Sequence, residues 1–140
     1  MPRPHYNILI VDDSPHDRAT CKRYLQRDPV RNYTLWEEDL SRKGLVAAQV
    51  VKPDCILLDY RFPDIDGLQF LSQLQVLLGQ RMPAVVMLTG SDREGVAIEA
   101  MKRGAQDYLV KPLDYDRLVT SLQTLCKYWF KVVTIPQTRN

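Results

Sequence analysis

Residues 55–64 read Cys-Ile-Leu-Leu-Asp-Tyr-Arg-Phe-Pro-Asp, and this stretch decides the fold. Its four leading apolar residues form a run short enough for a strand that is buried on both faces, as in a parallel sheet. The run stops at Asp59, and a turn-rich segment follows that contains Pro63 and ends at Asp66-Gly67. Asp59 is therefore predicted at the carboxyl end of a central strand, which is the edge of an open α/β sheet where ligands bind.

Length and composition favour a single globular domain. The chain has 140 residues, enough for one domain with a hydrophobic core and too few for two ordinary ones. Hydrophobic residues make up 45% and charged residues 26% of the chain, which is typical of soluble proteins. The formal net charge of +2 is too small to indicate binding to nucleic acid or to a membrane, and we expect neither.

The sequence also predicts a cytoplasmic location. No apolar run approaches the roughly 18 residues that a membrane-spanning helix needs, and the N-terminus lacks the pattern of a signal peptide. Cys21, Cys55 and Cys126 form no CxxC motif and cannot all pair within one chain. We therefore expect reduced and mostly buried cysteines, as in a cytoplasmic protein.

Five strands alternate with five helices in the predicted secondary structure. Short apolar runs ending at turn or polar residues give strands at 6–11, 33–36, 55–59, 84–88 and 107–110. Helical spacing of apolar residues, with capping signals, gives helices at about 15–27, 45–51, 67–78, 92–103 and from 115 onward. The N-cap residues expected from these signals are Ser14, either Ser91 or Asp92, and Asp114.

This alternation predicts an α/β fold with a parallel sheet and helices on both faces. Right-handed crossovers leave few topologies, and strand order 2-1-3-4-5 is the common one for five strands, the flavodoxin-like doubly wound (βα)5 arrangement. No linker or internal repeat appears before about residue 131. We therefore expect one domain at 1–131 and a C-terminal tail at 132–140.

Four of the predicted strands end in side chains that suit one site. Asp12-Asp13 follow the first strand, Asp59 ends the third, Thr89 the fourth and Lys111 the fifth. Two unit charges ~5 Å apart repel by about 3 kcal/mol at an effective dielectric constant of 20, so acids gathered there need a cation. Hard oxygen ligands suit Mg²⁺. An ammonium and a hydroxyl, in contrast, suit a phosphoryl group.

These residues resemble the signature of the receiver domain of two-component response regulators. Asp12-Asp13, Asp59, Thr89 and Lys111-Pro112 have the order and spacing of that family. The phrases LLDYRFPDIDG and GAQDYLVKPLD fit the same pattern, and the resemblance covers roughly residues 6–130. The chain would then be a signalling phosphoacceptor rather than an enzyme, catalysing only its own phosphoryl transfer and dephosphorylation.

The resemblance implies a role for each site residue. Asp59 would be the phosphoacceptor, taking its phosphoryl group from a sensor histidine kinase, a phosphotransfer protein or a small phosphodonor. Asp13, Asp59 and the backbone carbonyl of Arg61 would bind Mg²⁺ directly, and Asp12 would act largely through water. Lys111 would pair first with Asp59 and then with a phosphoryl oxygen.

The resemblance also implies a switch. Thr89 would hydrogen-bond another phosphoryl oxygen and Tyr108 would follow it inward, while the Lys111–Pro112 peptide bond would be cis. The fourth helix, fifth strand and fifth helix would form the face that changes and contacts an output partner, which the sequence does not name. Arg61 and Ser91 lie where receivers vary and would flank the route of an attacking water.

Other readings fit parts of the pattern. A phosphohydrolase that forms an aspartyl phosphate carries D-x-D, but Arg61 takes the place of the second acid. A flavin-binding electron carrier needs a loop rich in Ser, Thr and Gly after the first strand, where this chain reads DDSPHD. A receiver used only for protein interaction need not retain all the site residues found here. Asp64 and Asp66 are interpreted as turn residues, because Phe62 occupies the first acidic position of a calcium loop.

The end of the chain is more apolar than a receiver needs. Tyr128-Trp129-Phe130 follow the residues expected to seat the last helix, and at about 100° per residue the three rings cannot all face the sheet. Exposed aromatic surface often marks an interface. We expect this segment to dock against a second copy, giving a homodimer, or against a downstream partner; the alternative is that it folds back over its own domain.

Sedimentation of the full chain beside a version ending at Lys127 tests this expectation. If the segment is an interface between copies, the full chain should sediment as a dimer and the shorter one as a monomer. If both are monomers and the shorter one melts at a lower temperature, the segment folds back instead.

Overall fold

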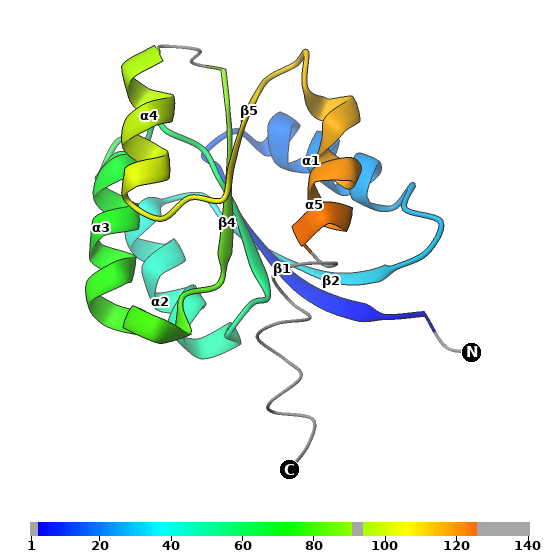
Figure 1. Ribbon diagram of the computed structural model, residues 1–140, viewed down its shortest axis with the longest axis horizontal. Coiled ribbons are helices and arrows are strands. Elements are labelled where there is room, and N and C mark those ends of the chain that lie inside the picture. The colour runs from blue at the N-terminus through cyan, green and yellow to red at the C-terminus, as the bar shows by residue number, and fades with distance from the viewer. Residues whose placement is uncertain (1–2, 91–93, 126–140) are drawn as a thin grey trace.

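A five-stranded parallel sheet forms the centre of this computed structural model, which describes residues 3–90 and 94–125 (Figure 1). Its strands are β1 (His5–Val11), β2 (Asn32–Glu38), β3 (Cys55–Leu58), β4 (Ala84–Thr89) and β5 (Asp107–Val110). They lie in the order β2-β1-β3-β4-β5, and all four pairings are parallel. The predicted fold class and strand order are confirmed.

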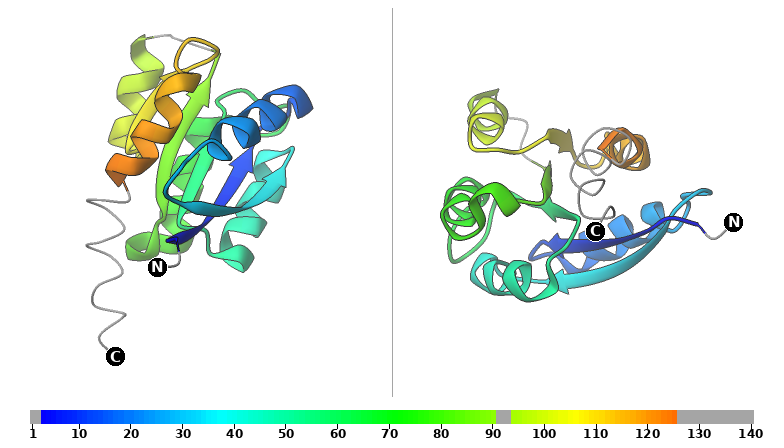
Figure 2. Two further views of the ribbon diagram at one scale, coloured as in Figure 1. Left: turned by 90° about the vertical axis from the view of Figure 1, so that its right-hand side faces the viewer. Right: turned by 60° about the horizontal axis from the view of Figure 1, so that its bottom comes forward.

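Helices cover both faces of the sheet. They are α1 (Pro15–Leu25), α2 (Ser41–Val51), α3 (Gly67–Leu78), α4 (Glu94–Lys102) and α5 (Leu118–Leu125), with short 3₁₀ helices η1 (Gly79–Arg81) and η2 (Tyr115–Arg117). As Figures 1 and 2 show, α1 and α5 lie on one face and α2, α3 and α4 on the other. No helix among the described residues has the length and apolar character needed to cross a membrane.

The central strands are apolar along their whole length because each face has its own core. Ile8 and Ile10 of β1 pack into the core beneath α1 and α5, while Leu9 and Val11 pack into the core beneath α2 and α3. All four residues of β3 and all six of β4 are buried. Burial on both faces explains why these strands read as continuous apolar runs rather than as an alternating pattern.

The starts of α2 and of the last helix depend on capping partners that are distant or unexpected. Helix α2 begins at Ser41, before the apolar stretch 45–51 from which it was predicted, because the Asp64 carboxylate accepts the backbone N–H groups of Ser41 (3.3 Å) and Arg42 (2.8 Å). Asp114 occupies the N-cap position of η2, as predicted for the start of the last helix, but its side chain makes no capping hydrogen bond and instead accepts the backbone N–H of Val110 at 2.9 Å. The turn η2 therefore precedes α5.

The starts of α1 and α3 carry local side-chain caps. Ser14 accepts the backbone N–H of Asp17 at the start of α1, as predicted. Asp66, interpreted above only as a turn residue, caps α3 in a reciprocal arrangement with Gln69. The predicted cap at Ser91 or Asp92 lies outside the described residues, as do Cys126 and the whole aromatic segment from Tyr128 onward.

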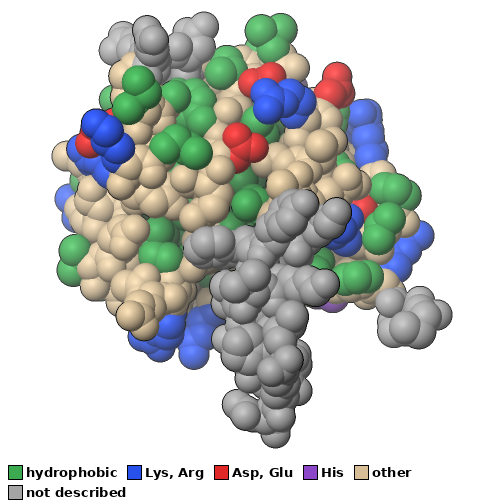
Figure 3. Space-filling model, in the orientation of Figure 1, with side chains coloured by type: hydrophobic (Ala, Val, Ile, Leu, Met, Phe, Trp, Pro, Cys, Tyr) green, Lys and Arg blue, Asp and Glu red, His purple; other side chains and the backbone are tan. Residues whose placement is uncertain are grey.

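Apolar side chains on the face shown in Figure 3 lie in separate patches among polar and charged ones. The exposed large apolar residues of the described chain come from several elements. They are Val30, Trp36, Val46, Val50, Val76, Leu77, Ile98, Met101 and Leu113. Cys21 and Cys55 are buried, as predicted.

The loop after β3 depends on a glycine at the start of α3. The backbone N–H of Gly67 donates to the Tyr60 carbonyl at 2.6 Å. A Cβ at Gly67 would lie 2.5 Å from the carbonyl oxygen of Asp59 and 3.0 Å from the Cα of Tyr60. Because both neighbours are backbone atoms, an alanine would push the start of α3 away from the end of β3.

We therefore expect Gly67→Ala to lower the free energy of unfolding by about 1–3 kcal/mol, the usual cost of forcing extra volume into a packed site. Gly95→Ala is the matched control, because a Cβ there meets nothing within 4 Å. Alanine is favoured over glycine in helices, so the control should be neutral or more stable by up to ~1 kcal/mol. Urea unfolding of the two variants measures both effects, and equal stabilities would contradict the close approach at Gly67.

Candidate functional site

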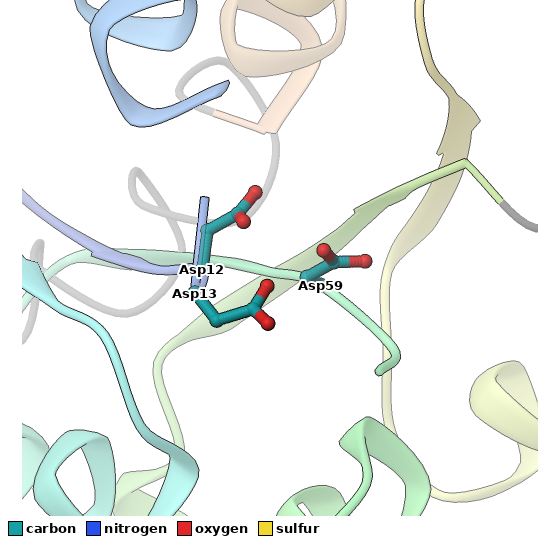
Figure 4. Close-up of side chains that lie close together, drawn as sticks. All are labelled: Asp12, Asp13 and Asp59. Carbon is teal, nitrogen blue, oxygen red and sulfur yellow. The ribbon is translucent and has the colours of Figure 1, made fainter. Parts of the chain in front are cut away.

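Three aspartates meet at the carboxyl edge of the sheet because their strands are neighbours in register. Val11 of β1 pairs with Leu58 of β3, and the backbone N–H of Asp59 donates to the Val11 carbonyl at 3.0 Å. The residues that follow the two strands therefore lie side by side. Asp12, Asp13 and Asp59 each offer a carboxylate oxygen, and these atoms all lie within 4.8 Å of one another (Figure 4).

The three carboxylates differ in burial and in their hydrogen bonds. Asp12 is buried, and its Oδ1 accepts the backbone N–H of Ser14 at 2.9 Å. Asp59 is half-buried, and its Oδ1 accepts the backbone N–H of Tyr60 at 2.6 Å. Asp13 is exposed. The cluster thus extends from a fixed, buried acid to one in contact with solvent.

Lys111 supplies an ammonium group to the cluster from the end of β5. Its Nζ lies 2.6 Å from Asp12 Oδ2, 2.9 Å from Asp17 Oδ2 and 3.2 Å from Asp59 Oδ2. The side chain is only 8% exposed. Its backbone N–H donates to the Thr89 carbonyl at 2.9 Å, and the peptide bond to Pro112 is cis, the isomer that the family resemblance implies.

Burial and charge set the protonation of the buried pair. Burial raises the pKa of Asp12 to about 6, although the hydrogen bonds from Lys111 and Ser14 oppose the shift. Burial alone would lower the pKa of Lys111, but its hydrogen bond to Asp12 and the charge of Asp59 outweigh burial and raise that pKa. Lys111 is therefore a cation throughout the physiological range, and it is the cation that the acids share.

A cavity of about 830 Å³ opens over the cluster. It is lined by Asp13, His16, Asp17, Thr20, Asp59, Arg61, Thr89, Gly90, Lys111, Pro112 and Tyr115. Thr89, at the end of β4, is 1% exposed. Of the predicted site residues, Asp13, Asp59, Arg61, Thr89 and Lys111 thus line one cavity, whereas Asp12 does not line it.

Tyr108 is not part of this arrangement. Tyr108 does not line the cavity; it is half-buried on β5 and packs against the core beneath α2 and α3. It lies opposite Met87 in the pairing of β4 and β5, two residues before the pair formed by Thr89 and Val110. Ser91 lies outside the described residues.

Asp17 is the site residue that the sequence analysis missed. It lies in the first turn of α1, lines the cavity and pairs with Lys111. The predicted start of the helix could have identified Asp17. A helix that begins at Pro15, soon after Asp12-Asp13, places its first turn over the same edge of the sheet. His16 is exposed and also lines the cavity.

The donor atoms fit a hard divalent cation. Three carboxylates within 4.8 Å of one another supply the oxygen ligands that Mg²⁺ and similar ions take. With Asp17 the site holds four acids around one lysine, so it carries excess negative charge. The cluster therefore suits a metal together with a further anionic group that Lys111 can contact.

A parallel α/β domain with three clustered aspartates and a lysine at its carboxyl edge defines a class of protein whose site suits a metal ion. A family model, the response regulator receiver domain, matches residues 8–123, and the chain belongs to this family. The resemblance stated from the sequence is thereby confirmed.

Individual relatives agree with this assignment. The chemotaxis protein CheY of Listeria monocytogenes is 29% identical over 120 residues, which are 86% of this chain and 98% of that protein. The transcriptional regulatory protein SrrA of Staphylococcus aureus is 31% identical over 86% of this chain but only 47% of its own length. The signal receiver domain of a putative Luxo repressor protein from Vibrio parahaemolyticus superposes with a TM-score of 0.77 at 28% identity, covering 90% of this chain and 92% of that one.

The raised pKa of Asp12 predicts how the stability of the metal-free protein changes with pH. A carboxyl whose pKa is higher in the folded than in the unfolded chain holds its proton more tightly when folded. Its contribution to the free energy of unfolding therefore falls as the pH rises from about 4 to about 6. The asparagine in Asp12→Asn does not ionise. The free energy of unfolding of this variant should therefore rise relative to that of the wild type over this window, by at most about 3 kcal/mol.

Urea unfolding in the presence of EDTA, at several pH values across that window, measures the difference between the two proteins. Asp116→Asn, which removes an exposed acid that does not line the cavity, gives the baseline for losing one carboxylate. A difference between wild type and Asp12→Asn that stays constant with pH would contradict a shift caused by burial.

Proposed function

We propose that this receiver domain accepts a phosphoryl group on Asp59 from the phosphohistidine of a sensor histidine kinase or phosphotransfer protein, with Mg²⁺ as cofactor. The observation that carries the proposal is the cluster of Asp12, Asp13 and Asp59, whose ligand oxygens lie within 4.8 Å of one another beside Lys111. Family membership supports a histidine kinase as donor and an output partner as recipient of the signal.

Asp59 is the acid best suited to act as nucleophile. Asp12 is buried, does not line the cavity and makes the shortest contact with Lys111. Asp59 lines the cavity, and its contact with Lys111 is the longest of the three. In the proposed step a carboxylate oxygen of Asp59 forms a bond to phosphorus while the bond from phosphorus to the donor nitrogen breaks, and the electron pair stays on the imidazole.

The other residues stabilise the charge of the transferred group. Asp13, Asp59 and the Arg61 carbonyl are proposed to bind Mg²⁺, with Asp12 acting through water. The ion supplies positive charge against the phosphoryl oxygens. Lys111 contacts one phosphoryl oxygen and the Thr89 hydroxyl another, and both line the cavity with Asp59.

The same contacts support a switch on the face made by α4, β5 and α5. In the proposal, Thr89 moves toward the phosphoryl group, and Tyr108, half-buried on the neighbouring strand, follows it inward. The changed face then binds the output partner. A cytoplasmic location and a homodimer through the C-terminal segment remain predictions from the sequence.

Asp59→Asn should abolish phosphorylation while leaving the fold intact, because the amide is close in shape but not a nucleophile of this kind. Incubation with acetyl phosphate and Mg²⁺, followed by intact-protein mass spectrometry, should show one hydroxylamine-sensitive phosphate on the wild type and none on the variant. Asp54→Asn is the matched control, since Asp54 precedes β3 whereas Asp59 follows it. If Asp59→Asn takes up label as fast as the control, the acceptor is another residue.

A further inference from the structure

All three N–H donors of the Lys111 ammonium are used within the site. A lysine ammonium carries three N–H donors, and Lys111 contacts the carboxylates of Asp12, Asp17 and Asp59. The two shorter contacts, 2.6 and 2.9 Å, are to Asp12 and Asp17, and the contact to the proposed acceptor is 3.2 Å. The ammonium is therefore held more closely by the two acids that are not phosphorylated.

Of those two acids, only Asp17 can give up its contact with Lys111 at little cost in free energy. Asp12 is buried with a side-chain exposure of 4%, and its second oxygen is fixed by the backbone of Ser14. Asp17 has a side-chain exposure of 29% and lies on the first turn of α1, where its carboxylate can turn toward solvent. No other hydrogen bond to the Asp17 carboxylate is described in the part of the chain that the structure covers.

Asp17 also lies on the wall of the cavity that an incoming phosphoryl group must enter. A phosphoryl group brings strong acceptor oxygens and a negative charge of about two units close to Lys111. The Asp17 carboxylate repels that charge and occupies a donor of the same ammonium. The two anions therefore compete for one cation.

We propose that Asp17 is a positioning residue that competes with the phosphoryl group for Lys111 and so slows phosphorylation of Asp59. This inference rests on the proposed function of the site. In the unphosphorylated protein Asp17 draws the ammonium away from the acceptor. During transfer Asp17 releases Lys111 and turns toward solvent, and the freed ammonium approaches the phosphoryl oxygens.

Asp17→Asn removes the competing charge and nearly preserves the shape of the side chain. With acetyl phosphate at saturating Mg²⁺, the variant should take up phosphate about five-fold faster than wild type, the ratio that corresponds to a weak, partly exposed ion pair. Asp116→Asn is the matched control, because it changes the net charge equally at an exposed position that does not line the cavity. It should react at the wild-type rate.

A second variant and a second measurement separate this role from a purely structural one. Asp17→Glu keeps a carboxylate within reach of Lys111 and should return the rate toward that of wild type. Beryllium trifluoride, a non-covalent stand-in for the phosphoryl group, should bind Asp17→Asn about five-fold more tightly in the presence of Mg²⁺. Thermal melts of all variants show whether each is folded.

The outcomes are distinct. A wild-type protein that labels on Asp59, with Asp17→Asn no faster than Asp116→Asn, overturns the competition and leaves the proposed function standing. A slower Asp17→Asn also overturns it, since Asp17 would then hold Lys111 in a productive position. Absence of label on the wild type would overturn both proposals.

Discussion

The register of the parallel strands holds several carboxylates close together although they repel one another, and the site depends on this constraint. The pairing of β1 with β3 fixes Asp12 and Asp59 side by side despite the repulsion between their carboxylates. Lys111 reaches them from the end of β5 and is the cation that offsets part of this charge. Packing on both faces of the sheet supplies the free energy that keeps these acids close, because the sheet cannot spread without exposing its core.

The loop after β3 connects the carboxyl edge of the sheet to the starts of two helices. Because Gly67 has no Cβ, α3 can begin directly against the backbone of Asp59, so the start of this helix is in contact with the residue that follows β3. Asp64, in the same loop, accepts the first N–H groups of α2. One loop thus orients the proposed acceptor and fixes the ends of two helices. A change of charge at Asp59 acts on a segment that is already tied to two helices on the same face.

The sequence predicted the parts of the structure that depend on local pattern. The apolar runs at 55–58 and 84–88 identified buried strands, and the residues directly after the strands identified the acids and the lysine. Contacts between distant segments were not predictable in this way: Asp64 caps a helix more than twenty residues earlier, and Asp17 meets a lysine at the far end of the chain. The error at Asp114 has a different origin: its carboxylate accepts a backbone N–H at the end of β5, four residues earlier, rather than one in the turn that follows.

In the proposed phosphoryl transfer, the arrangement of acids around Lys111 lets one lysine serve both states of the site. A buried ammonium with a single carboxylate partner would lose that contact if the partner became an acyl phosphate, and a buried charge without a partner is costly. Here Asp12 remains as a buried partner in either state, because both its oxygens are fixed and it is not the proposed acceptor. In the proposed transfer Lys111 would therefore stay bound to Asp12 while its contacts with Asp17 and Asp59 are exchanged. The ammonium would then move only a short distance between neighbouring oxygens rather than between protein and water, which suits a site that gains and loses a phosphoryl group as proposed.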